Sequence, residues 1–551
     1  MKINTLGDLI KNSSIQFSNQ PALGFTGEKM MTYSEVYSKV NSIIKFLDDC
    51  GVTKNDRVAI LSLNQPDWGV AYFAIARMGA IVVPILPDFT EKEVESVLNH
   101  SEAKAIFVSE TLYRKVSNYK NDSLKHIILI EKFALLDRSV DYSDFSSISS
   151  SLDETNIVEK EYDVNEDDVA SIIYTSGTTG KSKGVMLTHK NLVFSAIGSG
   201  KIHPMCPGDS MLSVLPLSHT YENTIGLILP MMYGACINYL RKPPVPSVLL
   251  PALKSVRPTI MLTVPLIIEK VYKGSVLPKF NAKTLTRVLF KFAPTRKLLS
   301  IIAGKKLMET FGGRIKFFGI GGAKLDPEVE RFLIEAKFPY AVGYGLTETS
   351  PLLAGFDSFK GKHQSTGPAM EGVTLKINDP DPVTNQGEIW AKGDMVMKGY
   401  YKEPELTSQV ITEDGWFKTG DLGCFDKSGY LFIKGRLKNM TVGASGENIY
   451  PEEIEEIINR FNYVLESVVV QKKGKIVAMV HFNREELMLK YQNLKEQAEI
   501  LIDKKIDELV KELQDYINSH VNKFSRVQIV IPHNEPFEKT ATKKIKRFLY
   551  Y

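Results

Sequence analysis

The sequence predicts an α/β protein: a large N-terminal domain of two parallel-type sheets with a β-barrel-like subdomain, followed by a small α+β domain. Three observations predict this class. Short apolar runs alternate with amphipathic stretches over the first three hundred residues, a pattern typical of parallel strands covered by helices. From about residue 361 the apolar runs are short and are separated by Gly, Pro, Asp and Asn, which is typical of antiparallel sheets. After residue 435 strands alternate with charged helical segments.

The N-terminal part contains two series of expected strands. Helices are expected between the strands of the first series, at residues 67–78 and 91–99. The strands of that series are expected at 57–63, 80–86, 105–108 and 126–130, and a further strand-like run covers 169–173. The second series is expected at 211–215, 259–264 and 315–320. Strands of this kind form parallel sheets with helices on their faces.

The C-terminal part changes character twice. Residues 361–435 form the β-rich subdomain, with strands expected at 374–378, 387–391, 416–419 and 430–434. Beyond it we expect a helix from Pro451, strands at 467–471, 475–482 and 527–531, and a solvated amphipathic helical region at 485–521. The predicted division is therefore an N-terminal domain of residues 1–435, a hinge at 436–439 and a C-terminal domain of residues 440–551.

Composition excludes several classes of protein. The 551 residues carry a net charge of only +4, which argues against a nucleic-acid binder that works through a broad basic surface. The four cysteines are scattered and include no C-x-x-C pair, so neither a zinc site nor a disulfide framework is indicated and a reducing cytoplasm fits best. The N-terminus lacks the apolar segment of a secretory signal. The longest apolar run, residues 224–240, is broken by Gly and Pro and predicts a buried wall rather than a membrane span.

The most informative segment is YTSGTTGKSKG at residues 174–184, directly after the strand-like run. Its glycines allow a close backbone approach, and its N–H groups and hydroxyls can donate to phosphate oxygens. Lys181 and Lys183 add positive charge. The segment misses the kinase P-loop pattern, because Thr175 stands where the first glycine is required. No G-x-G-x-x-G dinucleotide motif is present, and a Gly/Ser-rich surface loop is the local alternative.

Six further segments follow the loop in order. They are PLSH with Glu222, GIGGA at 319–323, GYGLTET at 343–349, TGD at 419–421, Gly435-Arg436 with Lys438, and KTATKKIKR at 539–547. Together with the loop, these segments resemble the signatures of acyl-adenylate-forming (AMP-binding) enzymes, and the closest subgroup is the bacterial long-chain fatty acyl-CoA synthetases. The resemblance covers essentially the whole chain, and it implies a mobile C-terminal domain with its hinge at Gly435-Arg436.

This resemblance implies a set of site residues. The phosphates of ATP would be bound by Thr175, Ser176, Gly177, Thr178, Thr179, Gly180 and Lys183. Glu348 would hold Mg²⁺ with Thr175, since a hard cation prefers carboxylate and hydroxyl oxygens. The rest of the nucleotide would be bound by Gly321, Gly322, Ala323, Tyr344, Gly345, Thr347, Asp421, Arg436 and Lys438, and the forked charge of Arg436 suits either ribose or phosphate. Of these, Asp421 would accept hydrogen bonds from the ribose, whereas a turn before Gly423 is its local alternative.

Catalysis is assigned by the same resemblance to Lys544, Glu348, His219 and Thr175. An ammonium group at Lys544 would stabilise the charge that develops between the α-phosphate and the acyl oxygen. Lys543 stands where the family usually has glycine, so the choice between Lys543 and Lys544 stays open. Val442 and Asn439 also depart from the family pattern. His219 is expected beside the carboxylate of the acid.

Two surfaces bear on the substrate. Residues 224–240, with Gly319 and Ile320, are candidates to line an apolar acyl pocket, although the sequence does not set its depth. Residues 284–306 interleave apolar and basic side chains. Such a stretch can lie on an anionic bilayer, which would make the protein peripheral on the inner face of the membrane. A solvated helix pair packed on the core explains the pattern equally well.

Three functions are compatible with these residues. The first is a long-chain fatty acid:CoA ligase that uses ATP, Mg²⁺ and coenzyme A and forms an acyl-AMP intermediate. The second makes acyl-AMP but passes the acyl group to an acyl carrier protein. The third is a non-catalytic nucleotide-binding regulatory module. A nucleic-acid partner is not expected, and an amino acid substrate is disfavoured because no acidic anchor for an α-ammonium group is evident.

Overall fold

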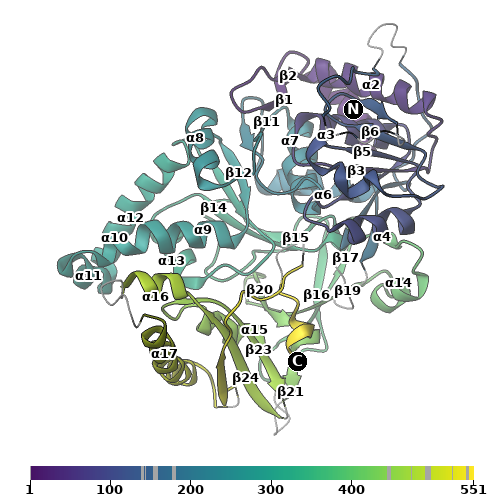
Figure 1. Cartoon of the computed structure of the whole chain (residues 1–551). Helices are drawn as coiled ribbons and strands as arrows, with labels where there is room; N and C mark the ends of the chain where they lie inside the picture. The colour runs from purple at the N-terminus through teal and green to yellow at the C-terminus, as the bar shows by residue number, and fades with distance from the viewer. Residues whose placement is uncertain are drawn as a thin grey trace.

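The computed structural model describes residues 2–551 except 138–139, 141, 143, 153–158, 176–181, 443–447, 473, 491–497, 524 and 541–544. Its large lobe is built on two sheets of eight strands each (Figure 1). In spatial order, the first sheet contains β18 (Gly399–Tyr400), β9 (Lys183–Thr188), β8 (Val169–Thr175), β4 (Ile81–Ile85), β3 (Arg57–Leu61), β5 (Ala105–Val108), β6 (His126–Leu129) and β7 (Ala134–Leu136). The second contains β15 (Leu352–Gly355), β14 (Tyr340–Gly345), β13 (Phe317–Ile320), β12 (Ile260–Thr263), β10 (Ser210–Leu212), β11 (Cys236–Tyr239), β1 (Pro21–Phe25) and β2 (Met31–Thr32).

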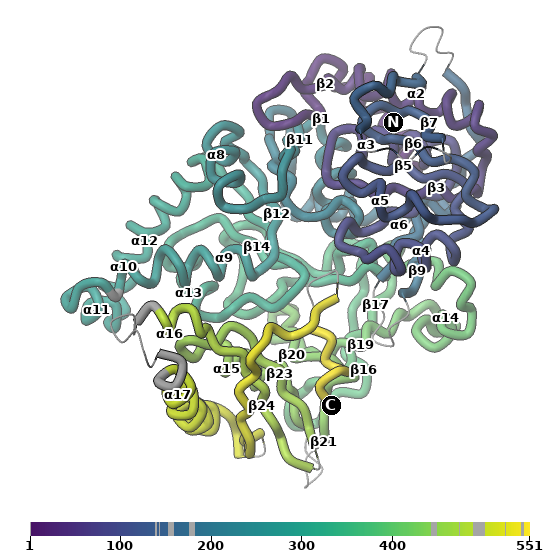
Figure 2. Tube along the Cα trace, viewed as in Figure 1, coloured from purple at the N-terminus to yellow at the C-terminus, as the bar shows by residue number. Residues whose placement is uncertain are grey.

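Helices fill the space between the two sheets. These are α1 (Leu6–Gln16), α2 (Tyr33–Asp49), α3 (Pro66–Arg77), α6 (His189–Ile202), the π-helical segment Glu222–Ile228 and α7 (Leu229–Tyr233). Threonine side chains cap the N-termini of α1, α2 and α6, so polar backbone groups at those ends are satisfied. The N-terminal purple strands lie beside teal β11 in the chain trace (Figure 2), since β1 pairs in parallel with β11.

The outer faces of the sheets are covered by separate helix layers. On the first sheet lie α4 (Glu91–Ser101) and α5 (Arg114–Ser117), and on the second lie α8 (Pro246–Val256), α9 (Pro265–Val271), α10 (Leu277–Asn281), α12 (Ala293–Thr310) and α13 (Pro327–Glu335). Helix α11 (Thr284–Lys291) contacts α10 and α12 at the end of this layer. Side chains along β3 alternate between the two faces of the sheet. Val58 and Ile60 face the central helices, whereas Ala59 and Leu61 face α4. The apolar runs read from the sequence therefore belong to strands buried on both faces.

The remaining units are smaller. An antiparallel sheet contains β16 (Thr374–Asn378), β17 (Gly387–Lys392), β19 (Phe417–Phe425) and β20 (Leu431–Arg436), and α14 (Pro404–Val410) follows β18. The small lobe contains β21 (Thr441–Val442), β22 (Asn448–Ile449), α15 (Pro451–Ile458), β23 (Val464–Lys472), β24 (Lys475–Phe482), α16 (Arg484–Lys490), α17 (Ala498–His520) and β25 (Ile529–Pro532). The predicted α/β fold class is confirmed. The exact domain division, with its hinge at 436–439, stays a prediction.

The lobes contact each other through polar groups at their rims. Lys324 Nζ pairs with Glu456 Oε2 at 2.5 Å, and Lys273 Nζ donates to the carbonyl oxygen of Asn459 at 3.2 Å. Among the described residues, no helix is both long and apolar enough to cross a bilayer. The predicted buried wall at 224–240 lies in the core, where Leu227, Ile228 and Met231 have no exposed surface.

Candidate active site

The segment assigned to phosphate binding is the connection of a hairpin. Strand β8 ends at Thr175 and β9 begins at Lys183, and these two residues are paired across the antiparallel ladder. The predicted phosphate ligands Ser176, Gly177, Thr178, Thr179 and Gly180 lie outside the described residues, as does Lys544. The structure therefore describes the two ends of the segment. Their pairing brings the Thr175 hydroxyl and the Lys183 ammonium group close together at the ends of β8 and β9 in the first sheet.

A carboxylate from the second sheet faces this edge. Glu348 lies in the short 3-10 turn Thr347–Thr349 that follows β14, and Tyr400 Oη donates to Glu348 Oε1 at 2.9 Å. Tyr400 belongs to β18, which pairs with β9, and Lys183 Nζ lies 5.1 Å from the centre of its ring. Within the described part of the chain, no other donor reaches the Glu348 carboxylate. Its second oxygen is therefore available for a cation.

Two lysines share the space beside Glu348. Burial lowers the pKa of Lys183, and the nearby Lys438 ammonium lowers that pKa further, while Glu348 and Glu403 act in the opposite direction. Like charges repel, and an anion bound between the two lysines would reduce that repulsion. This arrangement suits a polyphosphate better than a neutral ligand.

A second polar cluster links β14 to the antiparallel sheet. Tyr344 Oη donates to Asp421 Oδ2 at 2.8 Å, and Arg436 Nε pairs with Asp421 Oδ1 at 2.8 Å. The Asp421 side chain is only 6% exposed, whereas that of Arg436 is 46% exposed. Burial, followed by the Asp421 charge, raises the pKa of the Tyr344 hydroxyl well above its ordinary value, so it acts as a donor. The predicted contacts of Tyr344 with the base and of Asp421 with the ribose stay predictions.

The glycine turns lie at the carboxyl ends of two neighbouring parallel strands, β13 and β14. Gly322 has φ +85°, a conformation that L side chains rarely adopt, and Gly322 and Ala323 are exposed. A Cβ atom on Gly345 would lie 1.7 Å from the carbonyl oxygen of Pro351, so only glycine fits there. In open α/β sheets ligands bind beyond the carboxyl ends of the strands, and Gly321, Gly322 and Ala323 lie there, directly after β13.

His219 is half-buried in the connection between β10 and the π-helical segment. The Tyr221 backbone N–H donates to His219 Nδ1 at 3.3 Å, so Nδ1 is the acceptor and the neutral ring carries its proton on Nε2. Tyr221 packs below the glycine turn: a Cβ atom on Gly321 would lie 3.2 Å from its ring. The histidine and the predicted nucleoside turn are thus joined through one tyrosine.

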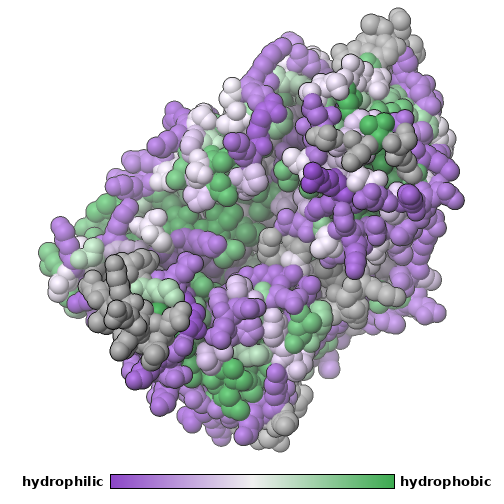
Figure 3. Space-filling model, viewed as in Figure 1, coloured by the Kyte–Doolittle hydropathy of each residue, from purple (hydrophilic) through white to green (hydrophobic). Residues whose placement is uncertain are grey.

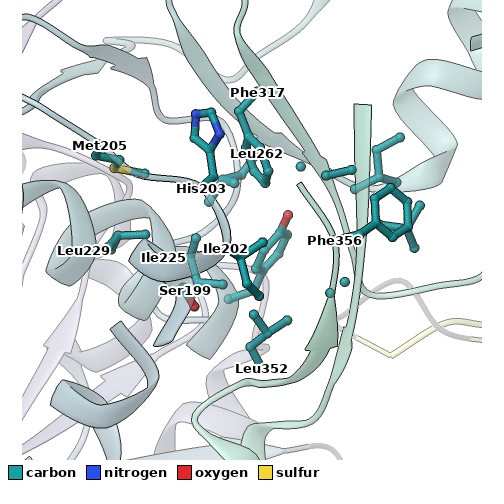
Figure 4. Close-up of a pocket in the computed structure, with 17 residues that line it drawn as sticks. Ser199, Ile202, His203, Met205, Ile225, Leu229, Leu262, Phe317, Leu352 and Phe356 are labelled. Carbon is teal, nitrogen blue, oxygen red and sulfur yellow. The ribbon is translucent and has the colours of Figure 1, made fainter. Parts of the chain in front are cut away.

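An apolar pocket opens beside Tyr221 (Figure 4). Ile225 and Leu229 come from the central helices, and Leu262 and Phe317 come from β12 and β13. Figure 4 shows these side chains directed toward a common space, with Leu352 and Phe356 on the opposite side. Gly319 and Ile320 also line this pocket, whereas most of residues 224–240 pack into the core, and the role of these residues in binding an acyl chain stays a prediction. The wall is chemically suited to hydrocarbon.

Comparison with known proteins decides the family. The AMP-binding enzyme family profile matches residues 11–401. The chain belongs to the AMP-binding enzyme family. A Drosophila melanogaster relative, long-chain-fatty-acid–CoA ligase heimdall, is 30% identical over 497 residues, which cover 83% of this chain and 72% of the relative. An Arabidopsis thaliana chloroplastic long-chain-fatty-acid–[acyl-carrier-protein] ligase, AEE15, is 29% identical over 83% of this chain and 73% of its own length.

The fold of this AMP-binding enzyme agrees with solved structures. The crystal structure of ATP-bound MatB from Rhodopseudomonas palustris has a TM-score of 0.76 and 22% sequence identity, with 98% of each chain covered. The predicted resemblance to acyl-adenylate-forming enzymes is confirmed. Because the relatives are ligases, the chain is an adenylate-forming ligase, and the non-catalytic regulatory module loses its support.

Sequence reasoning missed two residues of this AMP-binding ligase. Tyr400 reaches Glu348 only because β18 pairs with β9, more than 200 positions away in the chain, and no local pattern indicates that pairing. Tyr221 stands inside the PLSHTYE segment, so an aromatic directly after a predicted site histidine could have drawn attention to it.

Proposed function

We propose that this enzyme is an ATP-dependent long-chain fatty acid:CoA ligase that forms an acyl-AMP intermediate and releases AMP and pyrophosphate. The observation that carries the proposal is the convergence of Thr175, Lys183 and Glu348 at one edge of the sheets. The cationic and carboxylate groups at this site suit the triphosphate of ATP with its metal ion, and the apolar pocket in the same lobe suits the chain of a fatty acid. ATP would lie along the strand ends, and the acyl chain would lie in the pocket.

The reaction has two displacements. A carboxylate oxygen of the acid bonds to the α-phosphorus of ATP while the bond from that phosphorus to the bridging oxygen breaks, and pyrophosphate leaves. The thiolate of coenzyme A then bonds to the acyl carbon, and the C–O bond to AMP breaks. Positioning and charge stabilisation supply most of the catalysis in such transfers. Lys183 and Lys438 would hold the phosphates, and His219 Nε2–H would donate toward the carboxylate of the acid.

Glu348 and Thr175 fit the Mg²⁺ that such a reaction requires. Magnesium usually takes one or two carboxylates and completes its coordination with substrate phosphates and water. Glu348 offers one oxygen without a protein donor among the described residues, and Tyr400 orients the carboxylate through the other oxygen. When bound, the ion would neutralise charge on the phosphate oxygens. Tyr400 is thus a positioning residue.

The Tyr400 assignment has its own test. We expect Tyr400→Phe to weaken the apparent Mg²⁺ affinity about tenfold, as is typical when an outer hydrogen bond to a metal ligand is lost. The measurement is the Mg²⁺ dependence of ATP–pyrophosphate exchange, with Tyr401→Phe as the neighbouring control. An unchanged Mg²⁺ dependence together with a lower rate would assign Tyr400 a structural role instead.

The acyl pocket supports a hydrocarbon substrate. Ile225, Leu229, Leu262 and Phe317 offer no charged group, so a substrate is held there by apolar burial. Each buried CH₂ group contributes about 0.8 kcal/mol, so affinity should increase steeply with chain length until the pocket is filled. Fatty-acid-dependent ATP–pyrophosphate exchange across acids from acetate to long chains tests both the reaction and the preference. Exchange that does not depend on any fatty acid would overturn the proposal.

The C-terminal lobe is assigned the second half of the catalytic apparatus. We propose that Lys544 reaches the α-phosphate when the lobes close about the 436–439 hinge, and that it withdraws before the thiol attacks. Lys544→Ala should abolish acyl-AMP formation while coenzyme A transfer from supplied acyl-AMP continues. Lys543→Ala is the matched control for the neighbouring ammonium group. Equal loss of both half-reactions in Lys544→Ala would contradict the assignment.

A second acceptor is supported by one specific finding. The AEE15 relative is an acyl-carrier-protein ligase of similar identity to the coenzyme A ligases, so the phosphopantetheine of a carrier protein is the alternative thiol. Measuring acyl transfer to coenzyme A and to a holo acyl carrier protein separates the two.

We place the enzyme in the cytoplasm, on the inner face of a membrane, because its four cysteines are all free and its substrate is a lipid.

A further inference from the structure

Positive charge is distributed very unevenly along this chain. Between Lys270 and Lys306 the sequence contains ten Lys and Arg residues and no Asp or Glu. Because the whole chain carries +4, the remaining residues together carry −6. Such a concentration of cations attracts an anionic surface that comes within a Debye length of about 8 Å at physiological ionic strength.

The same segment exposes large apolar side chains. It forms α11 and α12, which project at the left end of the large lobe in Figure 1. Among the described residues, Leu285 is 69% exposed, Val288 46%, Phe292 62%, and Leu298 and Ile302 59% each. None of the residues of α11 is buried. Figure 3 shows hydrophobic atoms in green at that end of the molecule, among purple hydrophilic ones.

The other face of α12 is already attached to the protein. Arg296 Nη2 pairs with Glu335 Oε1 of α13 at 2.8 Å, and Ser300 Oγ donates to Glu335 Oε2 at 3.1 Å. Gly304 lies against Ala336, where a Cβ atom would approach that residue to 2.7 Å. One side of α12 is therefore fixed against α13, and the exposed apolar side chains lie on the side of the helix that faces away from the protein.

Cations surround the apolar face. They are Lys283, Arg287, Lys291, Lys297, Lys305 and Lys306, and all are exposed. Within the described part of the chain none of them forms an ion pair with a carboxylate. Their aliphatic stems can lie along an apolar surface while the charged ends reach phosphate groups. Apolar side chains ringed by unpaired cations are what an interfacial helix presents to a bilayer.

We propose that the α11–α12 hairpin docks this enzyme on the surface of an anionic phospholipid bilayer. Leu285, Val288 and Phe292 enter the boundary between headgroups and acyl chains, and the surrounding cations contact lipid phosphates. The proposal extends the proposed function, because long-chain fatty acids partition into bilayers and a docked ligase would meet its substrate there. The docking itself requires no substrate, so it can be tested separately.

The test is vesicle flotation with the full-length protein in the absence of ATP, fatty acid and coenzyme A. Vesicles of phosphatidylcholine alone are compared with vesicles containing phosphatidylglycerol, at low and high salt. One variant carries Leu285→Ser, Val288→Ser and Phe292→Ser, and a second carries Lys291→Gln, Lys297→Gln and Lys305→Gln. We expect binding only to anionic vesicles, loss of binding at high salt, and a decrease of at least about tenfold in the partition coefficient of each variant.

Matched controls exclude a general effect of altered surface. Phe359→Ser with Val383→Ser removes apolar side chains of similar exposure elsewhere, and Lys92→Gln with Lys120→Gln removes exposed cations of another region. We expect both controls to bind as the unaltered protein does, and unfolding temperatures to be unchanged.

Three outcomes would overturn the proposal. They are an unaltered protein that stays unbound, variants that bind as well as the unaltered protein, and a dimer in sedimentation that the apolar variant dissociates. The last outcome would assign the face to a second copy of the chain. None of these outcomes bears on the ligase reaction, which is measured by pyrophosphate exchange without vesicles.

Discussion

Glu222 should make the stability of this enzyme decrease as pH rises through the neutral range. The residue begins the π-helical segment between the two large sheets and is 1% exposed. Ser213 Oγ donates to Glu222 Oε1 at 2.6 Å, while Oε2 is buried with no hydrogen-bond partner among the described residues. Burial raises the pKa of this carboxyl from 4.5 to about 8, so it is protonated in the folded protein at pH 7.

The magnitude follows from proton linkage. Below about pH 4.5 the carboxyl is protonated in both the folded and the unfolded chain, so it makes no pH-dependent contribution. Between about pH 4.5 and pH 8 only the unfolded chain releases the proton, and the folded state loses about 1.4 kcal/mol of stability per pH unit. From pH 5 to pH 7 the loss is therefore about 3 kcal/mol. Above pH 8 both states are ionised and the loss levels off.

Glu222→Gln removes this proton and keeps the shape of the side chain. We expect the variant to gain stability relative to the unaltered protein steadily from pH 5 to pH 8. The measurement is the urea midpoint of the large lobe at each pH, followed by tryptophan fluorescence. Glu405→Gln, on the exposed surface of α14, controls for the loss of one carboxylate. A stability difference between Glu222→Gln and the unaltered protein that is constant over this range would refute the reasoning.

The remaining predictions concern packing in each lobe. Gly345→Ala would place a Cβ atom 1.7 Å from the Pro351 carbonyl oxygen, so we expect at least about 3 kcal/mol of destabilisation in thermal unfolding. Gly274→Ala is the tolerated control, because a Cβ atom there would meet no side chain or distant backbone within 4 Å. In the small lobe Arg547 Nη2 pairs at 2.7 Å with Oε2 of Glu455, whose side chain is 12% exposed, and burial raises the pKa of that carboxyl. Arg547→Met should destabilise the lobe by about 3–5 kcal/mol in urea unfolding, and adding Glu455→Gln should recover most of the loss. A double variant no more stable than the single one would contradict this account.

Local sequence patterns determined much of the fold. The strands at 105–108, 374–378 and 475–482 agree with β5, β16 and β24 residue for residue, because each is an apolar or alternating run bounded by turn residues. The helices expected to start at residues 67, 91 and 451 begin at Pro66, Glu91 and Pro451, because amphipathic periodicity acts within a few residues. The ordered motifs likewise identified the family, since each contains its own residue types at a fixed spacing.

Which motifs meet in space was decided by the tertiary structure. Strand β1 joins the second sheet beside β11, and β18 joins the first beside β9, through backbone hydrogen bonds that any residue can form. No local sequence pattern indicates such pairing. Tyr400 consequently became a neighbour of Glu348 and Lys183, and Tyr344 of Asp421, only after the sheets had assembled. Local periodicity specifies the elements because it acts over short distances, whereas the site depends on contacts between residues hundreds of positions apart.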